Sequence, residues 1–419
     1  MNCHEELYKF IDELSIIDTH EHLPLREELR NKDADVFQEY LSHYISTDLI
    51  SAGLSQEQYR QVMDGDLPIM TRWKILEPYW DCVQFTGYAR ALQIAVRDLY
   101  GIPHIGRDTI EELNEKFRAS IYPGRFREVL HDKCKIEKSL TVAWDRFAET
   151  DTELFKEVQN IEFLMQSPNS ESLRVLEQYY QGPLRSLADW QKAGQQFLLC
   201  RTEHQRVPVF KIGFAYQRPL LFEQVEKEQA EEVFLLAMKN LGVLNTAQER
   251  LFQDYMMHEI LKFLSPRHAV IQFHTGLQEG NGNILENSDP SLLNQLFLLY
   301  PNIRFDIFHM GIPYQGKLEM LVKMFPNVYI NLCWVHIISP IAAVEALDHW
   351  LDTLPINKIL AFGGDYLFID GVYGHQKMAR QNVCNALYRK IEQGVLTLED
   401  AKKIAQMIFF ENPAHLYGI

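Results

Sequence analysis

The sequence places residues that could bind a metal at the ends of segments that could form buried strands. The first of these segments runs from Ile16 to His22 with the sequence IIDTHEH, so two β-branched residues lead into two histidines spaced by one residue. In an extended strand, alternate side chains point to the same side, which puts His20 and His22 on one face roughly 6.5 Å apart. Two imidazoles at that spacing can hold one transition-metal ion.

Further ionisable groups follow apolar stretches later in the chain. Lys211 lies within 207–214, His274 follows VIQF, His309 follows FDIF, and Asp365 follows ILAFGG. Burying so many ionisable groups separately would be costly, whereas a shared divalent metal would turn that cost into binding energy. The nitrogen and oxygen donors favour zinc first, in one or two ions, and then manganese, iron or nickel.

Apolar stretches alternate with stretches typical of helices, which indicates parallel strands joined by crossovers. Eight strands are expected, which favours an α/β fold of the (β/α)8 TIM-barrel type over an open doubly wound sheet. The carboxyl ends of barrel strands meet at one mouth, so the ionisable groups there would converge. The predicted strands are 16–22, 136–142, 161–165, 207–214, 268–274, 303–309, 328–334 and 358–365.

A long segment, residues 24–131, separates the first two predicted strands. It has few β-branched runs and many Leu, Glu, Arg and aromatic residues. A connection of this length inside a compact fold is usually functional. We therefore expect a helical insertion after the first strand, placed on the top face of a single domain that spans residues 1–419.

Charge and cysteine usage restrict the kind of partner and the compartment. The formal net charge is -16, which argues against nucleic acid or an anionic membrane as a partner and leaves a small-molecule substrate. The six cysteines are widely spaced, as in reduced thiols of a cytosolic protein. We find no leading basic and apolar segment and no bilayer-length apolar stretch. We expect a cytoplasmic protein, with self-association left open.

These residues together resemble the amidohydrolase superfamily, in the branch near uronate isomerases. The resemblance covers essentially the whole chain in strand order. The insertion with Arg72 and Trp73 is similar to that of the uronate isomerase side. The matching positions are Asp18-x-His20-x-His22, Lys211, His274, His309, Asp365 and the ending Asn412-x-x-x-x-Tyr417, while 210–218 is similar to a subgroup with poorly defined substrates.

The resemblance implies a metal-dependent hydrolase that acts on a small polar substrate, with a carboxylate and an amide, lactone or ester bond. His20, His22 and Asp365 would bind the first metal. A water activated by the metal would attack, and Asp365 would take its proton and pass it to the leaving group. In a one-metal enzyme, His274 would complete the site and His309 would polarise substrate or water.

In a two-metal enzyme, the resemblance gives other roles to the same positions. Lys211, carboxylated on its amine, would bridge both ions, and His274 with His309 would hold the second. From the residue itself, Lys211 has two further interpretations: an ion pair with an acid, or a cation that binds a substrate carboxylate. Asp18 is either a hydrogen-bond partner of the first-strand histidines or a structural buried carboxylate.

Six other residues are candidate substrate contacts, and for each the competing interpretation is packing or surface. Arginine suits carboxylate recognition because its guanidinium is a planar fork. The remaining histidines, including His43, are interpreted as ordinary packing or surface residues. Two rival functions stay open: a sugar-acid isomerase or decarboxylase on the same barrel site, and a non-enzymatic binding protein. The candidate contacts are Arg72, Trp73, Tyr216, Arg218, Trp334 and His336.

Overall fold

The computed structural model describes residues 2–143, 150–240 and 243–419. Its eight strands form one sheet in sequential order; the first strand pairs in parallel with the second, and from the third strand to the seventh consecutive strands pair in parallel. This is the α/β (β/α)8 TIM barrel that the sequence predicts. The strands are β1 (Ile16–Glu21), β2 (Ile136–Ala143), β3 (Phe155–Asn160), β4 (Val209–Ile212), β5 (Val270–Phe273), β6 (Arg304–Ile307), β7 (Val328–Asn331) and β8 (Ile359–Leu360).

The third strand is the one that the sequence misplaced. The prediction of a strand over 161–165 is wrong: β3 ends at Asn160, and residues 162–164 form a 3-10 turn. The apolar residues Phe163 and Leu164 are buried, but they belong to that turn and not to a strand. A short apolar run marks burial, but its periodicity does not separate a buried strand from a buried turn.

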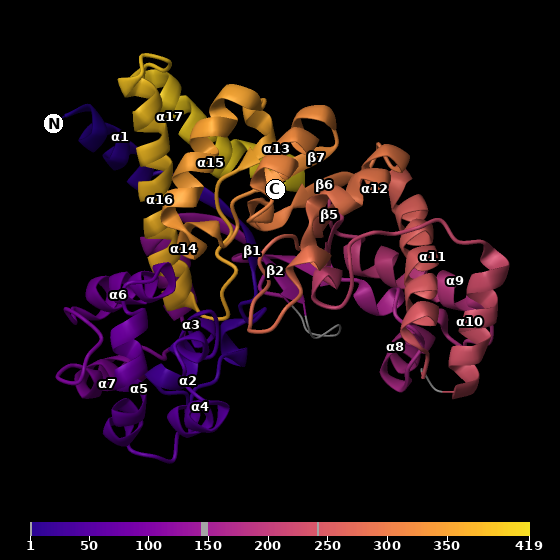
Figure 1. The fold of residues 1–419 in the computed structure, drawn as a ribbon, viewed down its shortest axis with the longest axis horizontal. Coiled ribbons are helices and arrows are strands. Elements are labelled where there is room, and N and C mark those ends of the chain that lie inside the picture. Colours follow the sequence, from indigo (N-terminus) through magenta and orange to yellow (C-terminus); the bar gives the residue numbers. More distant parts are fainter. Residues whose placement is uncertain (1, 144–149, 241–242) are drawn as a thin grey trace. The chain divides into compact units, whose positions relative to one another are not determined.

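The segment between β1 and β2 is helical, as predicted. Its helices lie together, in indigo to purple, in Figure 1. Three of their N-termini have side-chain caps; at α2, Asp35 accepts from two backbone N–H groups, and the Gln38 side chain accepts from the Asp35 N–H. The helices are α2 (Val36–Tyr40), α3 (Ile45–Ser51), α4 (Gln56–Met63), α5 (Ile69–Val83), α6 (Gly87–Tyr100) and α7 (Ile110–Ala119).

The chain forms two compact units, and we describe each by itself. The first unit comprises Met1–Glu157, Gln278–Asn283 and Asn331–Ala414. The second unit comprises Val158–Leu277, Ile284–Ile330 and His415–Ile419. The helices of the second unit, of which α8 to α11 gather together in Figure 1, are α8 (Ser170–Tyr180), α9 (Leu187–Thr202), α10 (Lys227–Asn240), α11 (Thr246–Leu264), α12 (Asn294–Leu299) and α13 (Gln315–Met324).

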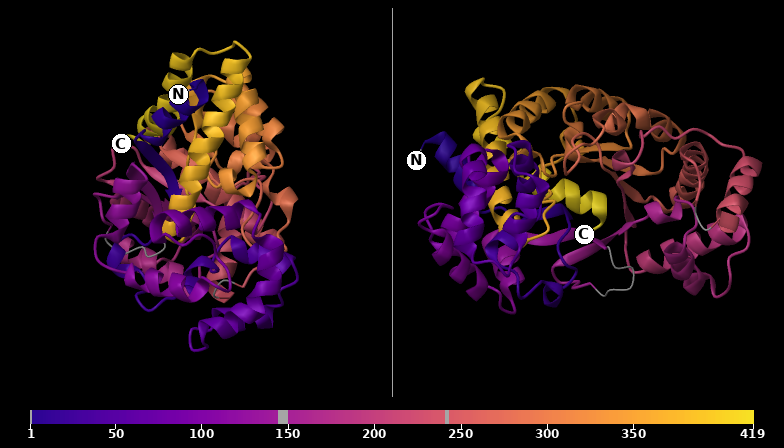
Figure 2. Two further views of the ribbon diagram at one scale, coloured as in Figure 1. Left: turned by 90° about the vertical axis from the view of Figure 1, so that its left-hand side faces the viewer. Right: turned by 60° about the horizontal axis from the view of Figure 1, so that its bottom comes forward.

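The longest helix, α16 (Ile369–Glu392), holds the first unit together. It packs against α1 (Cys3–Asp12), α6, α15 (Pro340–Thr353) and α17 (Leu398–Gln406), and Figure 2 shows it in yellow beside the indigo α1. Its Arg380 is 1% exposed and donates to the carbonyls of Leu14 and Cys134 at 2.9 and 2.8 Å. Among the described residues, we find no helix whose length and apolar character would suit a membrane span.

Candidate metal centre

Three predicted ligands meet in the first unit. His20 Nε2 lies 3.2 Å and His22 Nε2 lies 3.0 Å from Asp365 Oδ1. Each residue offers one ligand atom, and the three atoms lie within 4.8 Å of one another. Ligands about 2.1 Å from a tetrahedral ion are roughly 3.4 Å apart. Two imidazole nitrogens and a carboxylate oxygen in this arrangement therefore fit one divalent ion.

The backbone of β1 and of the loop after β8 sets this geometry. All six residues of β1 are buried, and the Asp365 N–H donates to the His20 carbonyl at 2.8 Å. Asp365 adopts a φ of 57°, in the left-handed region that residues other than glycine seldom occupy. Such conformations gather at functional sites, where the surrounding structure holds them in place.

The charge on Asp365 is set by its two histidine neighbours. Burial by itself would raise the pKa of Asp365, but the charges and hydrogen bonds of His20 and His22 outweigh it and hold the pKa well below its ordinary value. Asp365 is 4% exposed. The carboxylate is thus ionised throughout the neutral range, as a metal ligand must be.

Two further carboxyl groups, those of Asp18 and Glu21, hold in place the strand that carries the histidines. Asp18 Oδ1 accepts from the N–H groups of His20 and Gly364 at 3.2 and 3.1 Å, and Glu21 Oε2 accepts from the Tyr366 N–H at 2.8 Å. Burial raises the pKa of Glu21 well above its ordinary value, and the Asp18 charge raises it further. The buried site therefore disfavours the charged form of Glu21, and Asp18 orients the backbone that presents His20.

The structure also brings His43 to this cluster, although the sequence indicated only packing. His43 lies in the turn between α2 and α3 and is 8% exposed. Burial, followed by the nearby His22 charge, lowers its pKa to about 3, so its imidazole is neutral. Its Nδ1 has no hydrogen-bond partner among the described residues. The insertion thus supplies a neutral imidazole with a spare polar atom beside His22.

Aromatic rings form one wall next to these groups. The rings of Tyr44, Trp334 and Tyr88 are stacked, with 4.3 Å between the centroids of Tyr44 and Trp334 and 5.3 Å between those of Tyr44 and Tyr88. The Tyr44 hydroxyl donates to the Asp365 carbonyl. Trp334 has a φ of 66°. Burial raises the pKa of Glu279, and the nearby charge of Asp365 raises it further. No periodic signal marks Tyr44 or Glu279, because both lie in loops far from β1 in sequence.

The second unit holds the other predicted ligands. His309 Nε2 lies 3.0 Å from His274 Nδ1, and His274 Nε2 lies 2.9 Å from the Leu277 carbonyl. With its proton on Nε2, His274 donates to that carbonyl and keeps the Nδ1 lone pair, as histidine ligands commonly do. His309 has a φ of 60°. These two histidines could therefore hold a metal.

Lys211 is buried in β4, 6% exposed, with its Nζ 3.8 Å from the ring centroid of Phe308. Glu162 lies near Lys211. Burial raises the pKa of Glu162 more than the Gly213 N–H and the Lys211 charge lower it, and the resulting pKa is about 7. Tyr216 is 41% exposed, and its ring centroid is 4.7 Å from that of His274. Whether Lys211 binds a metal stays a prediction.

Five of the predicted substrate contacts are buried in the structure, and one of them is Trp334 of the aromatic wall. Arg72 forms an ion pair with the buried Asp35, and Trp73 is 1% exposed. Arg218 Nη2 lies 2.6 Å from Asp254 Oδ1. His336 is 1% exposed, with its Nε2 2.8 Å from the Ala361 carbonyl. Arg72, Arg218 and His336 thus have structural partners, and contact of any of the buried candidates with a substrate stays a prediction.

Comparison with known proteins relates this chain to one protein family. The amidohydrolase family model matches residues 183–419, more than half of the chain. Protein fluG of Emericella nidulans is 26% identical over 178 residues, which make up 41% of this chain and only 20% of that protein.

Two solved structures share the fold over nearly the full length. A uronate isomerase from Thermotoga maritima superposes with a TM-score of 0.81 at 15% identity, covering 99% of this chain and 97% of that one. A Lactobacillus casei protein described as a metal-dependent hydrolase gives a TM-score of 0.67 at 16% identity, covering 98% and 97%. At these identities, the likeness concerns the fold alone.

Proposed function

We propose, from the premise that the chain belongs to the amidohydrolase family, that it is a metal-dependent hydrolase of a small polar substrate. The observation that carries the proposal is the group of His20, His22 and Asp365, of which His20 and Asp365 are buried and whose ligand atoms lie within 4.8 Å of one another. The family implies a divalent metal, and zinc is our first choice because the donors are two imidazoles and one carboxylate.

Asp365 and His43 would have different chemical roles beside the metal. When bound, a divalent metal supplies Lewis acidity and lowers the pKa of a coordinated water to about 7. Asp365, kept ionised by its neighbours, would accept the proton of the attacking water and deliver it to the leaving group. His43, neutral and with Nδ1 available, would donate to or accept from a polar group of the substrate.

For the second unit, we propose that His274 and His309 also serve metal chemistry. Their ring nitrogens are 3.0 Å apart, and the Leu277 carbonyl fixes the tautomer of His274. In a two-metal enzyme, both would hold the second ion with a carboxylated Lys211.

The test is turnover of a panel of small amides, lactones and esters that carry a carboxylate. We expect activity in the zinc- or manganese-loaded enzyme, none after treatment with a chelator, and recovery when the metal is returned. His20→Ala should stay inactive after the same return of metal. Turnover that survives both the chelator and His20→Ala would overturn the proposal.

The second candidate is a sugar-acid isomerase. The observation that favours it is that the insertion brings two further proton-carrying groups, His43 and Tyr44, to the metal cluster, where Tyr44 donates to the Asp365 carbonyl. An isomerase must move a proton between neighbouring carbons, which requires such carriers. Counting metal ions and weighing the peptide that contains Lys211 would separate the candidates. Two ions with a carboxylated lysine favour hydrolysis, and one ion with a free lysine favours isomerisation.

A further inference from the structure

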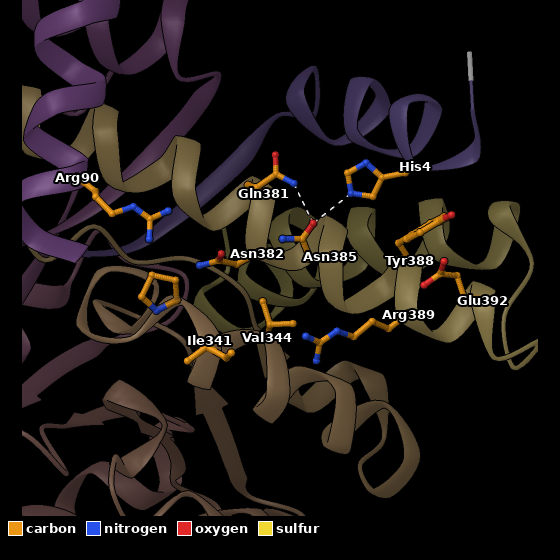
Figure 3. Close-up of a pocket in the computed structure, with 11 residues that line it drawn as sticks. His4, Arg90, Ile341, Val344, Gln381, Asn382, Asn385, Tyr388, Arg389 and Glu392 are labelled. Atoms are coloured by element: carbon orange, nitrogen blue, oxygen red, sulfur yellow. Dashed lines mark hydrogen bonds between the residues drawn. The ribbon is translucent and has the colours of Figure 1, made fainter. Parts of the chain in front are cut away.

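The first unit has a second concave region on helices that the proposed chemistry does not use. It is a cavity of about 440 Å³ between α1, α6, α15 and α16. Figure 3 shows side chains from these helices around it, and its polar lining is mostly on α16. Cavities that bind metabolites start at about 300 Å³, so a small molecule would fit. Its polar lining includes His4, Arg90, Gln381, Asn382, Asn385 and Arg389.

One side of the cavity is a chain of hydrogen-bonded polar groups. Asn385 Oδ1 lies 3.1 Å from His4 Nε2 and accepts from Gln381 Nε2 at 2.9 Å, as the dashed lines in Figure 3 show. Asn382 is 7% exposed, and its amide nitrogen lies 3.4 Å from the His336 carbonyl. These amides are held by neighbours before any ligand arrives, which lowers the entropy cost of binding.

Two guanidinium groups and one carboxylate are the charges of this cavity that no ion pair among the described residues neutralises. Neither Arg90 nor Arg389 forms an ion pair with any residue that the structure describes, and they come from different helices. Glu392, the acid in the lining, is hydrogen-bonded to Tyr388. In Figure 3, the Arg389 side chain extends along the cavity toward Val344. In a chain of net charge -16, two unpaired cations beside donor amides make a local field that suits an anion.

An adjoining hollow of about 280 Å³ shares Arg90, Gln381 and Asn382 with the cavity. Its other cations are already neutralised, since Arg97 pairs with Asp98 at 2.8 Å and Lys377 with Asp12 at 2.7 Å. The charges that remain are therefore those of Arg90 and Arg389, against the single carboxylate of Glu392. The shared residues let a ligand longer than a single anion extend from one hollow into the other.

We propose that this cavity binds a small oxyanion, a metabolite bearing phosphate or carboxylate groups, through Arg90 and Arg389. Guanidinium groups bind both kinds of oxyanion in bidentate fashion, and the Gln381 and Asn385 amides supply the remaining contacts. The site is formed by helices and needs neither the metal nor the residues of the metal cluster. It is thus a binding site in addition to the proposed function.

The experiment is isothermal titration of the metal-loaded full chain with inorganic phosphate and, separately, with citrate. We expect at least one probe to bind, and Arg90→Gln with Arg389→Gln to weaken that binding at least about tenfold, because charge-assisted hydrogen bonds are lost. Arg60→Gln, an exposed arginine on α4, is the matched control and should leave the affinity unchanged. Tighter phosphate binding indicates a phosphorylated ligand, and tighter citrate binding indicates a carboxylated one.

A second measurement locates the site without relying on the variants. Phenylglyoxal modifies accessible arginines, and mass spectrometry of the peptides should show that the bound probe slows the modification of Arg389 and Arg90 but not of Arg60. Affinity that is unchanged in the folded double variant would mean that the probe binds elsewhere, for example at the metal, and would overturn the proposal. Absence of binding by both probes, or of protection at both arginines, would do the same.

Discussion

His22 Nε2 lies 3.0 Å from Asp365 Oδ1, which joins the residue directly after β1 to the loop that follows β8. The Asp365 N–H in turn donates to the His20 carbonyl at 2.8 Å. The cluster therefore depends on a backbone hydrogen bond between β1 and the loop after β8 as well as on its three side chains. The same residues therefore form the candidate metal centre and connect the first and last parts of the first unit.

Replacing His22 by alanine should remove metal. We expect a loss of affinity larger than the roughly 10–100-fold that follows removal of a group that merely orients a ligand. Metal content after dialysis against a zinc buffer, measured by mass spectrometry of the metal, is the readout. His104→Ala is the control, because His104 is a half-exposed histidine paired with Asp108. Equal metal content in the two variants would mean that His22 is not a ligand.

His336 should make the folded state sensitive to acid. Burial, opposed only in part by the Ala361 carbonyl, lowers its pKa to about 4, against about 6.5 in the unfolded chain. The unfolded state therefore binds the proton first, so stability is complete above pH 6.5 and falls by about 3 kcal/mol as the pH drops to 4.

The measurement for His336 is urea unfolding at a series of pH values. His336→Gln should give a flatter dependence on pH between 6.5 and 4, whatever its absolute stability. His104→Gln, which removes a half-exposed histidine, should keep the slope of the wild type. If His336→Gln and the wild type lose stability in parallel, the buried imidazole is not the group that responds.

Arg72→Ala should destabilise the insertion. The Arg72 and Asp35 side chains are 2% and 0% exposed, and removing one partner leaves a buried charge, which costs about 3–5 kcal/mol. The pair of Arg60 and Glu57 in the same insertion is exposed, so Arg60→Ala should cost less than about 1 kcal/mol. Equilibrium unfolding compares the two. A nearly unchanged stability of Arg72→Ala would instead mean that the ion pair does not stabilise the insertion, and it would favour the predicted contact of Arg72 with a substrate.

Gly374→Ala should loosen the packing of α6 on α16. A Cβ at Gly374 would lie 1.9 Å from the Ala91 carbonyl oxygen, which is backbone and cannot rotate away. We expect a loss of about 1–3 kcal/mol or more in the free energy of unfolding. Gly316→Ala is the control, since nothing lies within 4 Å of the added atom there. Equal stability of both variants in thermal unfolding would contradict this close approach.

The sequence alone was sufficient for the order of the elements and for the residue types of the centre. Apolar periodicity located seven of the eight strands, because a buried parallel strand is a short, nearly continuous apolar run. The same signal failed at β3, since the apolar run over 161–165 is buried as a turn. Spacing on β1 was informative because His20 and His22 belong to one segment, whose geometry is local.

Tertiary structure decided what no local pattern encodes. His43 stands beside His22 because a turn of the insertion folds back to β1, and Arg72 turns inward because Asp35 is buried opposite it. The cavity at Arg90 and Arg389 exists only once α6 and α16 have packed together. Residue type and spacing determine which atoms could act. Which of these atoms come into contact depends on long-range packing, because the local sequence around one residue does not indicate which distant residue will lie beside it.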